Sequence, residues 1–126
     1  MNTPGFQIQL FTPRPEASIS WRLLSGNNRE AGRGAYPASD VDACLQAVTQ
    51  LQERIAGMQP RVRRVDPGGW SWEILSDGRV EVYASHRFDR LIRCEQAVVQ
   101  FVAEFAVAPI RAGLVISGAR RWSRAS

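Results

Sequence analysis

Residues 44–50 read CLQAVTQ and residues 94–100 read CEQAVVQ, so five of seven positions are identical at an offset of 50. Upstream, residues 21–25 (WRLLS) return as residues 72–76 (WEILS) at an offset of 51. A self-similarity with a period of about 20 to 50 residues indicates a repeated structural unit. The chain is therefore predicted to contain two copies of one unit.

Each copy begins with stretches in which apolar and polar residues alternate, the pattern of a half-buried strand. These stretches cover residues 6–10, 19–23, 70–74 and 80–84. Asp77-Gly78 lies between the last two and is typical of a two-residue hairpin turn. Trp70 and Trp72 share one strand face and are expected in the core. The third strand of the first copy, residues 30–35, is rich in glycine, so we expect it to be bulged or at a sheet edge.

The apolar period then becomes helical in both copies. The apolar stripes are Cys44, Ala47, Val48, Leu51 and Ile55 in the first copy, and Cys94, Ala97, Val98, Phe101 and Phe105 in the second. Ser39 or Asp40 is expected to cap the first helix and Asp89 the second. Short strands are predicted after the helices, at residues 61–65 and 114–117.

Each unit is thus predicted to run strand, strand, strand, helix, strand. The predicted fold is α+β: two tandem βββαβ repeats share one antiparallel sheet, with two helices on one face and pseudo-two-fold symmetry. Residues 1–126 are expected to form a single domain, because units of about 50 residues are marginal alone. Repeat one covers about 6–65, repeat two about 66–119, and a basic tail covers 120–126. We expect a monomer that is an internal pseudo-dimer.

The composition is that of an ordinary globular protein, with 44% hydrophobic and 22% charged residues. No apolar run is long enough for a membrane helix, and the first residues lack the pattern of a secretory signal. We therefore expect a cytoplasmic protein without membrane contact. The formal net charge of +4 permits a phosphate-bearing or acidic partner without requiring one.

The order of these features resembles the YegP-like family, also called DUF1508 or UPF0339. The shared pattern is Trp-x-Leu, a tight turn, a short strand, an aromatic residue near a helix start, and a helix with Cys-x-x-Ala-Val. The resemblance covers about Phe6 to Ser117 and implies tandem β(3)-α-β repeats with exchanged last strands. It implies no particular activity, since none is established for the family. The family's Asn-Gly turn is replaced by Asn27-Asn28 and Asp77-Gly78, and its Ser-Lys pair is not matched, because this chain contains no lysine.

The residues best suited to chemistry are explained by packing. Cys44 and Cys94 lie on the apolar stripes, where free cysteine behaves as a small buried hydrophobe. A metal site would need more Cys or His residues than the two cysteines and one histidine present. A catalytic pair of Cys94 and His86 would need a thiol that the helix pattern directs into the core. We expect no enzymatic activity, no cofactor and no metal.

Two arginine clusters are the polar features that most suggest a function. They consist of Arg61, Arg63 and Arg64, and of Arg120, Arg121, Trp122 and Arg124. Arginine with an interleaved tryptophan suits phosphate contact and base stacking. Alternatively, the first cluster belongs to a charged edge strand that resists pairing with another strand, and the second belongs to a frayed basic tail. The sequence predicts a small non-enzymatic binding or accessory module for an unidentified protein partner, with RNA or DNA as the alternative. Arg61, Arg63 and residues 120–124 are expected to be largely exposed.

Overall fold

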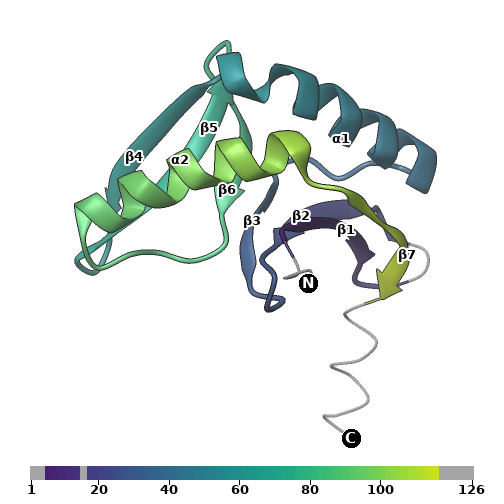
Figure 1. The fold of residues 1–126 in the computed structure, drawn as a ribbon, viewed down its shortest axis with the longest axis horizontal. Helices are drawn as coiled ribbons and strands as arrows, with labels where there is room; N and C mark the ends of the chain where they lie inside the picture. The colour runs from purple at the N-terminus through teal and green to yellow at the C-terminus, as the bar shows by residue number, and fades with distance from the viewer. Residues whose placement is uncertain (1–4, 15–16, 117–126) are drawn as a thin grey trace, which may run out of the picture.

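One seven-stranded sheet carries two helices on a single face in the computed structural model (Figure 1). The structure describes residues 5–14 and 17–116. In chain order, the strands, the two α-helices and a short 3-10 turn (η1) are β1 (Gln7–Thr12), β2 (Ser20–Leu24), β3 (Glu30–Gly34), α1 (Val41–Arg54), η1 (Ile55–Gly57), β4 (Gln59–Val65), β5 (Gly69–Ser76), β6 (Arg79–Ala84), α2 (Leu91–Val107) and β7 (Ile110–Ile116). The predicted α+β architecture with one sheet and two helices is confirmed.

The sheet is mixed. Its strand order is β4-β5-β6-β3-β2-β1-β7, and every neighbouring pair is antiparallel except β1 and β7, which run parallel. The expectation of a fully antiparallel sheet is therefore wrong at one edge. The reason is the connection: α2 carries the chain across the sheet, so β7 arrives beside β1 instead of folding back on β6 as a hairpin strand would.

The strand that follows α1 serves as the neighbour of β5. All seven residues of β4 pair with β5, so β4 takes the position beside β5 that β1 takes beside β2. Two complete βββαβ units would give eight strands, whereas the described residues form seven. Strands β4 and β7 also begin earlier than predicted, at Gln59 and Ile110. Pro60 is compatible with β4 because an edge strand leaves some N–H positions without a ladder partner.

The glycine-rich strand β3 lies in the middle of the sheet, between β2 and β6. The predicted edge position is wrong, whereas a bulge is present: Leu23 lies opposite Gly32 and Leu24 opposite Glu30. The glycines make room for large side chains of the core. A Cβ atom at Gly32 would lie 2.8 Å from Trp72 Cη2, and one at Gly34 would lie 2.4 Å from Trp21 Nε1. Glycine here therefore reflects close packing under two indole rings.

The two helices begin differently. The Asp40 carboxylate accepts a hydrogen bond of 2.8 Å from the Ala43 N–H, which confirms Asp40 as the cap of α1. The prediction that Asp89 caps α2 is wrong, because the N-cap residue is Arg90, whose side chain makes no capping hydrogen bond. The first amide groups of α2 thus lack the side-chain acceptor that those of α1 have.

The core lies between the helices and the sheet face that they cover. Its buried members from the strands include Ile8, Leu10, Trp21, Leu23, Trp72, Ile74 and Val82, and those from the helices include Cys44, Val48, Leu51, Cys94, Val98, Phe101 and Phe105. Trp21 stacks on Phe105 and Trp72 packs on Phe101, each with ring centroids 4.8 Å apart. The predicted apolar stripes are confirmed at eight of their ten positions, whereas Ala47 is exposed and Ala97, like Trp70, is only partly buried.

Candidate binding surfaces

Two members of the first arginine cluster share one acidic partner. The side chains of Arg61 and Arg63 are 53% and 57% exposed, and both pair with Glu73 on β5. Arg61 Nε donates to Glu73 Oε1 at 2.9 Å, and Arg63 Nε lies 3.6 Å from the same oxygen. Strand pairing brings these residues together, because Arg61 lies directly opposite Glu73. One of the two positive charges is therefore compensated.

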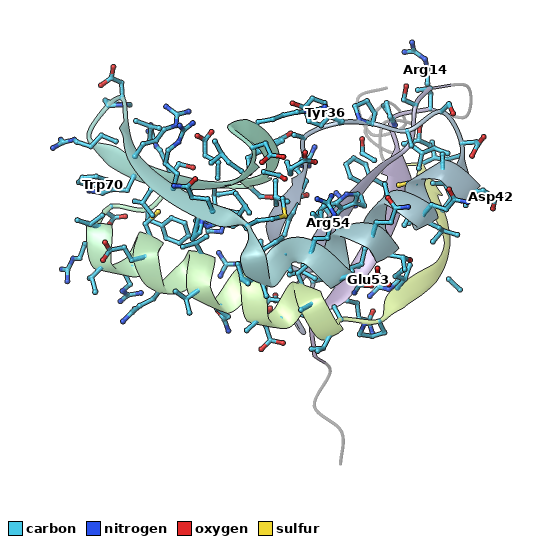
Figure 2. All side chains as sticks on the ribbon, turned by 90° about the horizontal axis from the view of Figure 1, so that it is seen from above. Arg14, Tyr36, Asp42, Glu53, Arg54 and Trp70 are labelled. Carbon is cyan, nitrogen blue, oxygen red and sulfur yellow. The ribbon has the colours of Figure 1, made fainter. Side chains whose placement is uncertain are left out.

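Arg64 points to the other side of β4. Its guanidinium carbon lies 5.3 Å from the centroid of the Trp70 ring, a cation–π contact. Figure 2 shows Trp70 at the end of the molecule where α2 begins. The second cluster, Arg120, Arg121, Trp122 and Arg124, lies outside the described residues. Of the two clusters, only the first therefore belongs to the part of the chain that the structure describes.

A basic cavity that the sequence analysis missed lies at the start of α2. Arg87, Arg90, Arg93 and His86 line a cavity of about 340 Å³ together with Phe88 and Asp89. The signal that would have found it is the concentration of basic residues between positions 86 and 93, although only Arg93 belongs to α2. The uncapped amide groups of α2 add a positive electrostatic potential at the same place.

The loop that carries this basic cavity is held against the start of β5. Phe88 and Trp70 exchange two backbone hydrogen bonds of 2.7 Å, and the Arg87 guanidinium donates to the Asp66 carbonyl oxygen. A Cβ at Gly69 would lie 3.1 Å from Arg87 Cδ, so the two segments are in close contact. Arg87 therefore has a defined position beside the start of β5.

The sheet face away from the helices carries a polar network around Glu30. Its carboxylate accepts hydrogen bonds from Arg33 at 2.7 and 2.9 Å, from Arg22 at 3.2 Å, and from the Ser85 hydroxyl. Burial by itself would raise the pKa of Glu30, but the hydrogen bonds from Arg33 and Ser85 and the charges of both arginines outweigh burial and hold this pKa below its ordinary value. Both guanidinium groups also lie over the Phe11 ring, within 4.9 Å of its centroid. The network is satisfied internally and rigidifies this face.

The two edges of the sheet differ in character. Edge strand β4 carries Pro60 and three arginines, which are features that discourage strand addition. Edge strand β7 carries one arginine, and its Leu114, Val115 and Ile116 are each 37% exposed. Among the described residues β7 pairs only with β1. Its outer edge is therefore open and apolar over these last three residues.

An apolar groove lies beside this open edge. It has a volume of about 390 Å³ and runs between β7 and the start of α1. Leu10, Val41, Leu45, Ile110 and Leu114 supply its apolar lining. Val41, the first residue of α1, is 37% exposed. The groove and the β7 edge form one continuous surface, because Leu114 belongs to both.

The residues with reactive chemistry lie in the interior. Cys44 and Cys94 are free thiols that are 2% and 0% exposed, and burial raises the pKa of both. No group of three metal-ligating side chains occurs within residues 5–14 and 17–116. In the same part of the chain, no helix is long and apolar enough to cross a membrane.

The fold has counterparts among solved structures. No family model and no curated protein matches the chain. A protein of unknown function from Escherichia coli, YegP, superposes with a TM-score of 0.65 and 8% identity, over 90% of this chain and 97% of that one. A UPF0339 protein from Shewanella oneidensis gives the same TM-score at 6% identity, over 90% of this chain and 93% of that one. The resemblance to YegP-like proteins is thus supported at the level of the fold, and the chain shares the fold of YegP and the UPF0339 protein.

Proposed function

We propose that this protein is a non-enzymatic interaction module that binds an extended segment of a partner protein along β7. The observation that carries the proposal is the open edge of Leu114–Ile116 beside the apolar groove. An added strand would gain main-chain hydrogen bonds from the edge, and its side chains would gain apolar contacts in the groove. Opposite this edge, β4 carries the arginines and the proline that discourage such pairing.

The proposed occupant is a short partner segment and not a second copy of the chain. Gly113 has φ of +91°, and the pairing register of β7 with β1 shifts between Ile8 and Leu10. The regular part of the edge is consequently only three residues long, from Leu114 to Ile116. Two such edges paired with each other would bury far less than the roughly 1,000 Å² that a stable interface needs. A short peptide can compensate by placing an apolar side chain in the groove.

Three further parts of the proposal rest on separate observations. The non-enzymatic role is supported by the burial of both thiols. The same free thiols suit the reducing environment of the cytoplasm, where we place the protein. The duplication is supported by the sheet order: outward from the β3–β6 pair come β2 and β5, and then β1 and β4, all antiparallel.

Selection of displayed random peptides on the full chain tests the peptide site. The expected peptides carry apolar residues at alternate positions, and their binding is lost in Leu114→Arg. Val99→Arg is the matched control, because Val99 is an apolar side chain that is 69% exposed on α2, away from β7. Equal binding to both variants would contradict the proposal. A dimer that disappears in Leu114→Arg would show a second copy at the edge and would equally overturn the partner segment.

Nucleic acid is the second candidate partner, and the basic cavity at the start of α2 favours it. Arg87, Arg90 and Arg93 line the cavity together with the aromatic ring of Phe88. If the cavity binds phosphates, retardation of a single-stranded RNA probe should fall steeply with salt, because such contacts release counterions. The triple change of these arginines to Glu should abolish retardation, while Arg120, Arg121 and Arg124 changed to Glu tests the tail separately. A wild-type chain that retards no probe at low salt would exclude this candidate.

A further inference from the structure

The outer side of α2 carries the most exposed large apolar side chains of the described residues. Ile92, Val99 and Val107 are 56%, 69% and 77% exposed, and no other large apolar side chain in this part of the chain exceeds 49%. Their spacings of seven and eight residues place them on one side of the helix, where Ala103 is also exposed. Figure 2 shows α2, in pale green, along one side of the molecule. Because these side chains form one stripe, they indicate a contact surface.

The other helix has a polar outer side at the same places. At the sequence offset of 50, Ile92 and Val99 correspond to Asp42 and Thr49 on α1, and both α1 residues are exposed. Both helices cover the same face of the sheet, so each needs an apolar inner side. A helix that faces water also needs a polar outer side, which α1 has at these positions and α2 lacks. The apolar stripe of α2 is therefore not required by the packing of the chain itself.

The stripe is symmetric about Val99. Ile92 lies seven residues before Val99, and Ala106 lies seven residues after it. Two antiparallel copies of α2 that meet at Val99 would therefore place Ile92 of one copy opposite Ala106 of the other. The small side chains of Ala103 and Ala106 let two helix axes approach to about 8–10 Å. A surface that is complementary to itself in this way suits a two-fold contact between identical chains.

Two charged side chains flank the stripe with matching symmetry. Arg93 lies six residues before Val99 and Glu104 five residues after it, and their separation of eleven residues is about three helical turns, so both lie on one flank of α2. In the antiparallel pair, Arg93 of one copy comes beside Glu104 of the other. Within the described residues, neither of these side chains forms an ion pair. The charges of two copies are therefore complementary at both ends of the contact.

We propose that the outer side of α2 binds a second copy of this chain, antiparallel and centred on Val99. The helix offers 17 residues, about 25 Å, for this contact, whereas the regular part of the β7 edge is three residues long. One helix pair is a small interface, so we expect a weak dimer with a dissociation constant of about 1 μM to 1 mM. The chain that its sequence led us to expect as a monomer is then one subunit of a dimer. The contact uses no residue of β7, so it is separate from the proposed peptide site.

Sedimentation equilibrium of the full chain, treated with nuclease, tests the proposal at concentrations from about 1 μM to 1 mM. The wild type should change from monomer to dimer over this range. Val99→Arg should weaken the dimer at least about tenfold, because two like charges would meet at the centre of an apolar contact. Thr49→Arg, which adds the same charge to the outer side of α1, and Leu114→Arg, which adds it to β7, should dimerise like the wild type.

Three results would overturn the proposal. They are a wild type that stays monomeric throughout the concentration range, a dimer that is unchanged in Val99→Arg, and a loss in Thr49→Arg or Leu114→Arg equal to that in Val99→Arg. The last result would place the contact on another surface or show that it is unspecific. The midpoint of urea denaturation of each variant checks that the variant is folded.

Charge reversal then tests the antiparallel arrangement without a change in the apolar stripe. Arg93→Glu and Glu104→Arg should each weaken the dimer at least about twofold, because each change affects two ion pairs. The double variant should restore the dimer, because opposite charges face each other again. Within one chain the two residues are about 16 Å apart along the helix, so this rescue reports a contact between copies. If Val99→Arg fails to fold, these variants decide instead, and a folded double variant without rescue would refute the arrangement.

Discussion

Replacement of Gly34 by alanine tests the packing of the central strand most directly. The new Cβ would lie 2.4 Å from Trp21 Nε1, 2.7 Å from Cε2 and 3.1 Å from Cδ1. Ordinary carbon contacts are about 3.5–4.0 Å, so the indole must move by about 1 Å. Trp21 is 4% exposed and stacks on Phe105, which leaves it little room to do so.

The expected cost follows from these contacts. Overpacking costs about 1–3 kcal/mol, and a weakened ring stack with Phe105 adds about 0.5–1.5 kcal/mol. Replacing glycine lowers the entropy of the unfolded chain and returns about 0.4–1 kcal/mol. Gly34→Ala should therefore lower the free energy of unfolding by about 0.5–4 kcal/mol, measured by equilibrium urea denaturation.

Two further variants make the Gly34 experiment decisive. Gly57→Ala is the control, because its Cβ would meet no atom within 4 Å, and its stability should be unchanged or slightly higher. In a Trp21→Phe background the cost of Gly34→Ala should shrink by at least about 0.5 kcal/mol, since every close contact involves the indole. A Gly34→Ala protein as stable as the wild type, or a cost independent of Trp21, would refute the reasoning.

Three further perturbations probe the core, the polar network and the thiols. Leu51→Ala and Phe101→Ala should each lower the free energy of unfolding by about 2–5 kcal/mol in urea denaturation, because both side chains are at most 5% exposed. A decrease below about 0.5 kcal/mol would contradict the burial of these helix faces. The folded-state pKa of Glu30 is lowered, so its stabilising contribution is complete above the unfolded pKa and disappears as the pH falls through the folded pKa. Glu30→Gln should therefore lose less stability than the wild type between about pH 5 and pH 3, and parallel pH profiles would contradict this. Cys44 and Cys94 should react with a thiol reagent only after unfolding, and rapid labelling of the native protein would show that they are accessible.

Local patterns in the sequence were sufficient for the elements and for the core. The alternation around Trp21 and Trp72 and the helical stripes of Cys44 and Cys94 predicted which faces are buried, because side-chain periodicity depends only on local geometry. The cap at Asp40 was predictable for the same reason. The role of Gly34 was misread, because its small size makes room for the indole ring of Trp21, which belongs to another strand.

Long-range pairing was not accessible from the sequence. Glu73 meets Arg61 only through the register of β4 on β5, so the compensated charge of the first arginine cluster could not be foreseen. The parallel place of β7 depends on the path of the chain across the sheet, and the open edge at Leu114 follows from it. The basic cavity was visible as the concentration of basic residues between positions 86 and 93, but its depth depends on the folded loop.

The parallel pairing of β1 with β7 also has a consequence for biosynthesis. Ile8 leaves the ribosome among the first described residues, and its partner Ile110 emerges about a hundred residues later. At about 5–20 residues per second, the outer side of β1 stays bare for roughly 5 to 20 seconds in every round of translation. During this interval β1 depends on β2 alone, and closure of so distant a contact makes the last step of folding entropically slow. Nascent chains would therefore be most exposed to misassociation at β1, the strand that the finished molecule covers last.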